Sequence, residues 1–325
     1  MTDLRDGGIA ALAGRGAEVV PLSGGYSGET FLVTSGGEQA VLRLYARRPE
    51  RAAVDQALLE RVRGLLPVPR VLEAAPVAGG PDRPPFLLLE ALPGDRLDLV
   101  LPAADAALRR RLGEAVAGVL VLLATERMPR AGTFVDATLD PAPFPAPAPG
   151  MASLERSGVA DDPEAWLAAH SGGPWFAGLP AADREALRRV AGRAKALTRR
   201  SGRTALVHAD FTPGNLLVDP ATGGVTGVID WECAYAGSPL ADVGALLRFE
   251  TDPDFTGAVA GSYALRAPDV PDDWVDVARA LDLVALMALT ARPAANPVVD
   301  GARALLRTTA RTGALAAGRP APGGS

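Results

Sequence analysis

The chain contains very few of the residues that build disulfide frameworks, zinc sites and P-loops. Its 325 residues include one cysteine, Cys233, and two histidines, so an intramolecular disulfide framework is excluded and a zinc site lacks ligands. The only lysine, Lys195, lies between alanines and does not form the Gly-Lys-Ser/Thr ending of a P-loop. The sequence therefore excludes a disulfide-bonded scaffold, a zinc enzyme and a Walker-type NTPase, and it indicates a reducing compartment.

Long apolar runs and basic clusters are also missing. The longest apolar run, residues 115–124, is about half of the roughly 20 residues that a membrane span needs, and residues 1–6 contain no apolar signal core. The formal net charge is −5 and the basic residues are scattered, whereas a nucleic-acid partner would require a basic stripe. We therefore expect a soluble cytoplasmic protein with no nucleic-acid or membrane partner. Its oligomeric state does not follow from the sequence.

The amino-terminal part alternates short apolar segments with glycine-rich turns. This pattern predicts an antiparallel meander, then a helix that starts with proline, then a buried strand. The predicted strands span residues 19–22, 30–34 and 39–45, the helix spans 49–65 and the buried strand spans 85–90. The sequence Ala-Leu-Pro-Gly at 91–94 interrupts the last strand, so we predict one lobe at 1–92 and a second at 93–325.

The rest of the chain is predicted to be mainly helical. Apolar periodicity indicates long helices at 103–125 and 274–291, the second with an apolar face formed by Trp274, Val277, Leu281, Val284 and Ala288. The proline-rich segment 141–150 suits an extended connector or the edge of a lid, and its role is open. The tail at 318–325 is predicted to be disordered.

A polar loop flanked by short strands contains the residues suited to chemistry. Residues 205–219 predict a strand, a loop with Asp210 and a second strand, and the turn at 220–224 leads to a third strand that ends at Asp230. If Asp219 stands opposite Thr226 in this hairpin, Asn215 falls opposite Asp230, about 5 Å away. A carboxylate and an amide oxygen at that distance suit Mg²⁺.

Less specific interpretations exist for each of these residues. Residues 210–215 alone favour a surface turn, and His208 alone is more typical of a hydrogen-bonded core histidine. Asp242 follows Ser238 and Pro239 and could simply complement a helix dipole. Cys233 suits a small buried position without a chemical role.

Taken together, these segments resemble a known family. The run from His208 through Asp210 to Asn215, followed by Ile-Asp-Trp-Glu at 229–232 and Gly-Ser-Pro-Leu-Ala-Asp at 237–242, is similar to the aminoglycoside phosphotransferase and choline kinase superfamily, distant relatives of protein kinases. The resemblance implies an α+β, bilobal protein-kinase-like fold with an antiparallel-sheet N-lobe and a mainly helical C-lobe. It implies that Asp210 is the catalytic base, that Asn215 and Asp230 bind Mg²⁺, and that His208 and Asp242 support the loop. The family more often has glycine where this chain has Ala209.

The amino-terminal lobe contains the parts that such a kinase uses to bind a nucleotide. A glycine-containing loop supplies Gly25, Ser27 and Gly28. Arg43 lies within an apolar strand, so either its tip reaches solvent or it has an anionic partner. Because this lobe has no lysine, Arg43 would contact the α- and β-phosphates. We expect Asp55 to pair with Arg43, with Glu60 as the alternative. The main chain of Glu90 and Leu92 would bind the purine of ATP or GTP.

The resemblance predicts transfer of a γ-phosphoryl group from ATP or GTP to a small-molecule hydroxyl. Seven acidic residues of the later helices could hold ammonium groups of an acceptor or form a solvated acidic surface: Glu250, Asp252, Asp254, Asp272, Asp273, Asp276 and Asp282. An Arg- and Ala-rich chain suits a GC-rich genome, and we favour an antibiotic or natural-product acceptor, in the service of self-resistance. The alternatives are a kinase of a primary metabolite (an amino alcohol, a sugar or homoserine) and a nucleotide-binding pseudokinase module.

Overall fold

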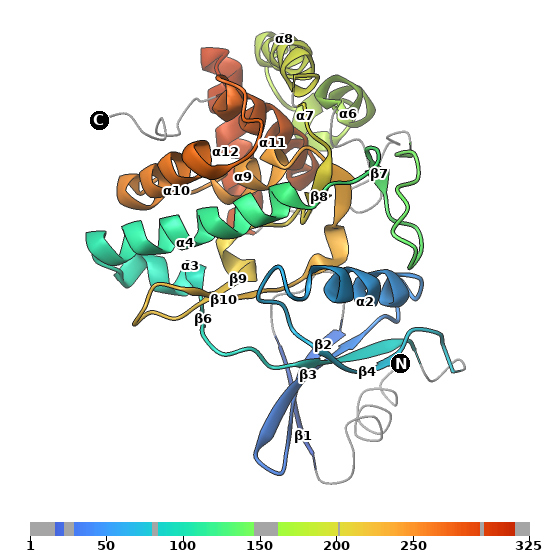
Figure 1. Cartoon of the computed structure of the whole chain (residues 1–325). Helices are drawn as coiled ribbons and strands as arrows, with labels where there is room; N and C mark the ends of the chain where they lie inside the picture. Colours follow the sequence, from blue (N-terminus) through green and yellow to red (C-terminus); the bar gives the residue numbers. More distant parts are fainter. Residues whose placement is uncertain are drawn as a thin grey trace. The chain divides into compact units, whose positions relative to one another are not determined.

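The computed structural model describes residues 17–22, 29–79, 84–145, 162–200, 202–292 and 296–315, arranged in two compact units (Figure 1). The first unit comprises the described residues of Met1–Gly94 together with Phe134–Asp140 and Thr226–Glu232. The second comprises those of Asp95–Thr133, Pro141–Val225 and Cys233–Ser325. The predicted glycine loop with Gly25, Ser27 and Gly28, residues 146–150 of the proline-rich segment and the predicted disordered tail lie outside the described residues.

The first unit is built on a five-stranded sheet in the order β1-β2-β3-β5-β4, and each neighbouring pair is antiparallel. The two-residue turn Gly36-Gly37 joins β2 to β3, with Ser35 opposite Glu38, as expected for a tight hairpin. Three strands of the predicted meander and the buried strand are confirmed within one or two residues. The strands are β1 (Glu18–Pro21), β2 (Glu29–Ser35), β3 (Glu38–Leu44), β4 (Val71–Ala75) and β5 (Phe86–Glu90).

Strand β4 was not predicted. It is an edge strand with a register shift between Val71 and Glu73, and its sequence Val-Leu-Glu-Ala-Ala has little of the β-branched and aromatic character that marks a strand. Only its pairing with β5 defines it.

Helix α2 (Arg51–Val62) belongs to the same unit and packs against β4 and β5. It is two residues shorter at its start and three at its end than the prediction of 49–65. Arg63 adopts an extended conformation, which ends the helix. The buried face includes Val54, Leu58 and Val62, the residues whose spacing predicted the helix.

The second unit is mainly helical, as predicted. Two long predicted helices are confirmed: α4, which starts three residues late because Asp105 accepts a hydrogen bond from the Leu108 amide as its N-cap, and α11. The helices of this unit are α3 (Leu97–Val100), η2 (Leu101–Ala103), α4 (Ala106–Thr125), α6 (Pro163–His170), α7 (Pro174–Ala177), α8 (Ala181–Thr198), η3 (Pro213–Asn215), α9 (Leu240–Leu246), α10 (Pro253–Arg266), α11 (Trp274–Thr290) and α12 (Pro297–Thr312). Among the described residues, no helix is both long and apolar enough to cross a bilayer.

Helix α11 lies at the centre of the second unit and packs against α6, α8, α9 and α12. The single apolar face predicted for it is too narrow, because Leu283, Leu286 and Met287 on other sides are buried as well. A helix that is surrounded by other helices has no solvent face to keep polar. Helix α9 approaches it so closely that a Cβ atom on Gly244 would lie 2.3 Å from the Ala278 carbonyl oxygen. This close packing helps to position α9, whose first turn contains Asp242.

Short strands frame the polar loop of the second unit. Strand β8 (Ala205–Val207) pairs with β11 (Tyr235–Gly237), which also pairs with β7 (Gly132–Thr133). Strand β9 (Leu216–Val218) pairs with β6 (Asp95–Arg96). The polar loop therefore runs from the end of β8 to the start of β9, and both of its ends are held by strand pairing.

The turn after β9 is tighter than predicted. The Asp219 amide donates to the Gly224 carbonyl (2.9 Å) and the Gly223 amide donates to the Asp219 carbonyl (2.8 Å), while Gly223 has a φ of +78°. This is the pattern of a bulge in which glycine takes the left-handed position. Asp219 thus faces Gly223 and Gly224, and the predicted register with Asp219 opposite Thr226 is wrong. The cause is local, since the Asp219 side chain accepts from the Ala221 amide and the Thr222 hydroxyl and closes the turn early.

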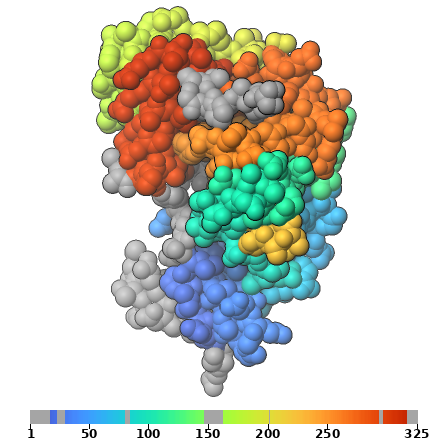
Figure 2. Space-filling model, turned by 90° about the vertical axis from the view of Figure 1, so that its left-hand side faces the viewer, coloured from blue at the N-terminus to red at the C-terminus, as the bar shows by residue number. Residues whose placement is uncertain are grey.

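This turn, which leads into β10 (Val225–Val228), lies on the surface against α4, shown in gold and teal in Figure 2. A Cβ atom on Gly223 would lie 3.0 Å from Cβ of Arg111 in α4. The bulge therefore also lets the turn pack closely on the helix.

Candidate active site

The loop that contains Asp210 begins where β8 ends. His208 is completely buried, and its ring meets that of Phe211 edge to face at 5.9 Å. Its Nδ1 accepts a hydrogen bond from the Asp210 amide (3.3 Å). Between them, Ala209 has a φ of +70°, in the region where a Cβ atom is costly and glycine is favoured. The loop therefore needs a left-handed residue at the position where the resembled family more often has glycine.

Asp242 holds this loop from the first turn of α9. Its carboxylate accepts the His208 amide on one oxygen and the Ala209 amide on the other, both at 2.8 Å. The pKa of Asp242 is raised to about 7. Burial raises it most and the negative charge of Asp210 adds to the rise, while the two amides act in the opposite direction. Asp242 thus contacts the loop itself, which a residue that only complemented the helix dipole would not do.

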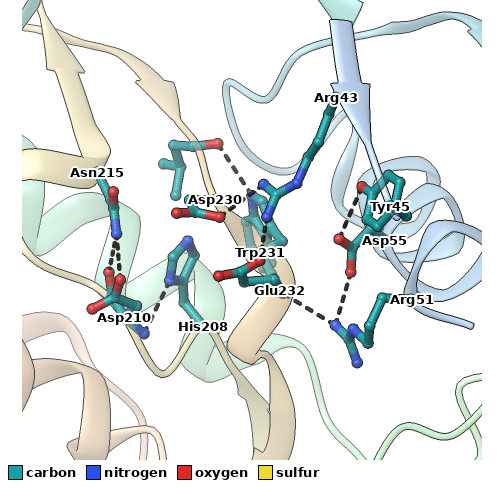
Figure 3. Close-up of polar contacts among 11 residues, drawn as sticks. Arg43, Tyr45, Arg51, Asp55, His208, Asp210, Asn215, Asp230, Trp231 and Glu232 are labelled. Atoms are coloured by element: carbon teal, nitrogen blue, oxygen red, sulfur yellow. Dashed lines mark hydrogen bonds and ion pairs between the residues drawn. The ribbon is translucent and has the colours of Figure 1, made fainter. Parts of the chain in front are cut away.

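Asp210 and Asn215 are joined at the other end of the loop (Figure 3). The Asn215 side-chain nitrogen donates to the main-chain carbonyl of Asp210 and to its Oδ2, both at 2.8 Å. The Thr212 amide also donates to the Asp210 carbonyl. These bonds orient one carboxylate oxygen of Asp210 and leave Oδ1 for a hydrogen from a ligand. They also turn the amide oxygen of Asn215 away from Asp210, which suits a metal ligand.

Arg43 binds two acids of the Ile-Asp-Trp-Glu segment within the first unit (Figure 3). Its Nη1 lies 2.8 Å from Asp230 Oδ1, and its Nη2 forms an ion pair with Glu232. Of the two environments predicted for this arginine, solvent or an anionic partner, the structure shows the second. Burial by itself would lower the pKa of Arg43, but the charge of Asp230 and of the other acids outweighs it, so the pKa is raised. Asp230 has a φ of +67°, a conformation that aspartate tolerates better than most residues.

Asp55 has different partners from those predicted. It binds Arg51 at 2.8 Å and accepts the Tyr45 hydroxyl at 3.0 Å, while Glu60, the alternative, accepts from Gln56. The predicted pairing of Asp55 or Glu60 with Arg43 is therefore not the one found. The reason is that Arg51 lies four residues before Asp55 in α2, a spacing at which two side chains of one helix meet.

Glu90 lies at the end of β5, where the purine-binding main chain was predicted. Its amide donates to the Arg70 carbonyl (2.9 Å) and its carboxylate binds the Arg70 side chain (3.0 Å). A purine contact by Glu90 would thus use its carbonyl oxygen. The purine contacts of Glu90 and Leu92 remain predictions.

The donors predicted for Mg²⁺ fit the ion chemically. Asn215 offers an amide oxygen and Asp230 a carboxylate, both hard oxygen ligands. No group of three or more His, Cys, Asp or Glu side chains in the described part of the chain is arranged to hold a metal ion, and Mg²⁺ at a phosphate site uses few protein ligands. Asn215 belongs to the second unit and Asp230 to the first, so their convergence remains a prediction.

Several acids of the later helices are used within the second unit. Four of the seven form ion pairs with arginines: Asp252 with Arg109, Asp254 with Arg110, Asp273 with Arg200, and Asp282 with Arg248. Glu250 differs, because burial raises its pKa, and the charges of Asp252 and Asp98 raise it further. Most of this acidic set therefore has a structural role.

Sequence reasoning missed three residues that bind Arg43 or Asp55. Glu232 shares the Ile-Asp-Trp-Glu segment with Asp230. Tyr45 directly follows β3 and lies two residues after Arg43, the spacing that puts two side chains on one face of an extended chain. Arg51 is four residues before Asp55, a spacing that signals an ion pair on a helix. Each signal was present in the sequence, but only the fold shows that Glu232 binds Arg43 and that Tyr45 and Arg51 both bind Asp55.

Comparison with known proteins identifies a family for this chain and a set of similar folds. The sequence matches the phosphotransferase enzyme family over residues 18–274, and no curated protein sequence matches it. Similar solved structures include the aminoglycoside phosphotransferase APH(4)-Ia (TM-score 0.66, 16% identity, covering 97% of this chain and 100% of that one). They also include the GDP and kanamycin complex of APH(2″)-IIIa (0.66, 17%, 91% and 93%) and a putative aminoglycoside phosphotransferase from Ralstonia eutropha (0.62, 17%, 96% and 97%).

At these identities the structures establish the fold, while the family match rests on the sequence itself. It spans more than half of the chain and includes both the Asp210 loop and the Arg43 strand. The chain belongs to the phosphotransferase enzyme family and is a small-molecule phosphotransferase with a protein-kinase-like fold.

Proposed function

We propose that this protein transfers the γ-phosphoryl group of ATP or GTP to a hydroxyl group of an antibiotic or another natural product. The observation that carries the proposal is the state of Asp210, whose carboxylate is fixed by Asn215 in a loop that Asp242 anchors through two amides. A base held in one orientation is what removal of a proton from a bound alcohol requires.

The proposed reaction assigns a separate task to each part of the site. Asp210 accepts the hydroxyl proton through Oδ1 as the alcohol oxygen bonds to the γ-phosphorus, and the bond to the β,γ-bridging oxygen breaks to release the nucleoside diphosphate. Arg43 holds the α- and β-phosphates with its forked donors. When bound by Asn215 and Asp230, Mg²⁺ would neutralise charge on the β- and γ-phosphates.

The proposed donor is supported by related structures. APH(4)-Ia was crystallised with AMP-PNP and hygromycin B, and APH(2″)-IIIa with GDP and kanamycin. Both purine nucleotides thus occur among proteins of this fold, and the main-chain contacts predicted for Glu90 and Leu92 distinguish them poorly. We therefore propose either nucleotide as donor.

The choice of acceptor follows from the acidic residues. Because Asp252, Asp254, Asp273 and Asp282 are neutralised by arginines, few carboxylates in this set remain to hold several ammonium groups. This favours an acceptor with few amines, such as a sugar- or nucleoside-containing natural product, over a polycationic aminoglycoside.

A release assay for nucleoside diphosphate tests donor and acceptor together. The purified protein is incubated with Mg²⁺ and ATP or GTP, and with a panel of aminoglycosides, neutral glycosylated antibiotics, nucleosides, sugars and amino alcohols. We expect acceptor-dependent release with at least one natural product and a phosphate ester on its hydroxyl. Release with choline, homoserine or a simple sugar alone would indicate a primary-metabolite kinase. Tight Mg²⁺-nucleotide binding without release for any acceptor would contradict the proposal and indicate a pseudokinase module.

A further inference from the structure

We propose that Arg51 is a positioning residue for Asp230, which it fixes by holding the main-chain carbonyl of Trp231. Asp230 is the carboxylate predicted to bind Mg²⁺, so this inference rests on the proposed function. It adds to that function a residue that lies outside all of the sequence motifs.

Arg51 is buried, with only 5% of its surface exposed, although it is the first residue of α2. Its Nη2 lies 2.8 Å from Asp55 Oδ1 and 3.5 Å from the Trp231 carbonyl oxygen. Its Nη1 lies 3.4 Å from the carbonyl oxygen of Phe134. One guanidinium group therefore joins α2 to two segments that lie far from it in the sequence, and all of these atoms belong to the first unit.

The short segment from Asp230 to Glu232 is held from two sides (Figure 3). Arg43 binds the side chains of its two acids, and Arg51 binds the carbonyl of the tryptophan between them. The segment also includes the start of a 3₁₀ helix, η4 (Trp231–Cys233), and the Trp231 indole donates to the Val228 carbonyl at 3.1 Å. The contact to the Trp231 carbonyl restrains the Trp231–Glu232 peptide, which begins one residue after Asp230. Asp230 itself has an unusual φ of +67°.

Asp55 gives this arrangement its stability. It receives the Tyr45 hydroxyl on Oδ2 and Arg51 on Oδ1, and its charge matches that of the buried guanidinium. Because Asp55 is satisfied by these two partners, Arg43 can direct both of its terminal nitrogens to Asp230 and Glu232. The contacts of Arg51 to the carbonyls are longer than its ion pair, so its two roles need to be separated by experiment.

The competing interpretation is that Arg51 only neutralises Asp55. A single Arg51→Met substitution cannot decide between the two, because it leaves Asp55 buried without its cation and threatens the fold. The informative pair of variants is Asp55→Asn and Arg51→Met/Asp55→Asn. Both lack the ion pair and both keep an acceptor for Tyr45, and they differ in the contacts of Arg51 to the two carbonyls.

The quantity to measure is the effect of the metal ion on the affinity of the protein for nucleotide. Calorimetry gives the affinity for adenylyl or guanylyl imidodiphosphate, whichever the unchanged protein binds, with Mn²⁺ and with EDTA. The ratio of the two affinities reports how well the metal ligands are placed, without any turnover. Thermal unfolding verifies that each variant is folded at the temperature of the titration, and Arg51→Lys/Asp55→Asn replaces the Met variant if that one does not fold.

We expect Asp55→Asn to keep the ratio within about threefold of the unchanged protein, and the double variant to lose a further tenfold or so, as for residues that orient metal ligands. Affinity in EDTA should be similar in the two variants. Equal ratios in the two folded variants would overturn the role of Arg51 and leave the proposed function intact. Failure of the unchanged protein to bind either nucleotide would instead overturn the proposed function, and the inference with it.

Discussion

The two segments that contain the key carboxylates are held in opposite ways. In the second unit, the loop of Asp210 is held by hydrogen bonds without any arginine. The Asp242 carboxylate accepts two loop amides, the Asn215 side chain donates to Asp210, and the His208 ring accepts the Asp210 amide. In the first unit, the segment of Asp230 is held by the charged guanidinium groups of Arg43 and Arg51. A carboxylate is thus fixed by hydrogen bonds in one place and by ion pairs in the other.

This difference suits the different tasks proposed for the two carboxylates. A base must keep one orientation throughout the reaction, and main-chain hydrogen bonds supply that without competing for a cation. A metal ligand must exchange one positive partner for another, and an arginine can move from a carboxylate to a phosphate when the metal arrives. The loop of Asp210 is therefore suited to stay fixed, and the segment of Asp230 is suited to exchange its partners.

Substitution of Asp210 should have the largest effect. Asp210→Ala removes the proposed base, so we expect kcat to fall by about 10²–10⁴ while nucleotide affinity stays nearly unchanged. Steady-state kinetics and calorimetry with the nucleotide measure the two quantities. Because Asn215 would lose one acceptor as well, Asp210→Asn is the matched variant and should also lose turnover. Substantial residual turnover in both would remove Asp210 from this role.

Arg43→Ala should chiefly weaken nucleotide binding. It removes charged hydrogen bonds to phosphate worth roughly 1.5–3 kcal/mol, which corresponds to a loss of about 10- to 100-fold in affinity. Arg43→Lys should recover only part of this loss, because one ammonium group cannot reproduce the fork that binds Asp230 and Glu232. Titration calorimetry measures the affinities, with Arg63→Ala, a change at an exposed arginine of the same unit, as control. An unchanged affinity in Arg43→Ala would separate Arg43 from the phosphates.

Asp242 should make stability depend on pH. Its pKa is raised from the ordinary value near 3.8 to about 7 in the folded protein, so the folded state holds the proton more tightly than the unfolded state. The contribution of Asp242 to the free energy of unfolding is fully present below about pH 4 and is lost as the pH rises to about 7.

Urea unfolding of the protein and of Asp242→Asn at pH 4.5, 6 and 7.5 measures this contribution. The variant cannot titrate at this position, so the stability of the unchanged protein relative to the variant should decrease with rising pH. A difference that stays constant would show that the anchor of the Asp210 loop does not titrate in this range.

The smallest effect should come from Ala209→Gly. A left-handed backbone costs a non-glycine residue roughly 1–2 kcal/mol, and glycine would remove this strain. Part of the gain is offset by the greater conformational freedom of glycine in the unfolded state. We expect a net stabilisation of about 0.5–1 kcal/mol in chemical unfolding. The control is Ala205→Gly in β8, where the backbone is extended and glycine should destabilise. Loss of stability in Ala209→Gly would mean that the Cβ atom makes contacts that outweigh the strain.

Much of the fold could be predicted from local patterns. Short apolar segments between glycine-rich turns defined β2 and β3, and the spacing of Val54, Leu58 and Val62 defined α2. Strand β4 was missed because its place at the edge of the sheet leaves its sequence without a strong pattern. The burial of α11 on all sides depends on its neighbours, which a single helix cannot reveal.

The site divides in the same way. The spacing of Asp210, Asn215 and Asp242 in short motifs indicated a functional loop, and the burial cost of Arg43 indicated either solvent at its tip or an anionic partner. The identity of that partner could not be predicted, because Asp230 lies 187 residues further along the chain. Local spacing favoured Asp55 as the partner of Arg43. Only the three-dimensional arrangement shows that Asp55 forms its ion pair with Arg51 instead.

The 187-residue separation between Arg43 and Asp230 also affects the order in which the parts of the protein fold during synthesis. The first unit needs residues 226–232 to complete it, and these leave the ribosome long after the sheet that receives them. At typical synthesis rates of about 5–20 residues per second, roughly 10–40 seconds pass between Arg43 and Asp230. During this time Arg43 lacks both of its acidic partners, whereas Arg51 already has Asp55 and lacks only the carbonyl oxygens that it contacts later in the chain. We therefore expect a protein truncated before residue 226 to be a poor independent domain, although it contains every strand of the large sheet.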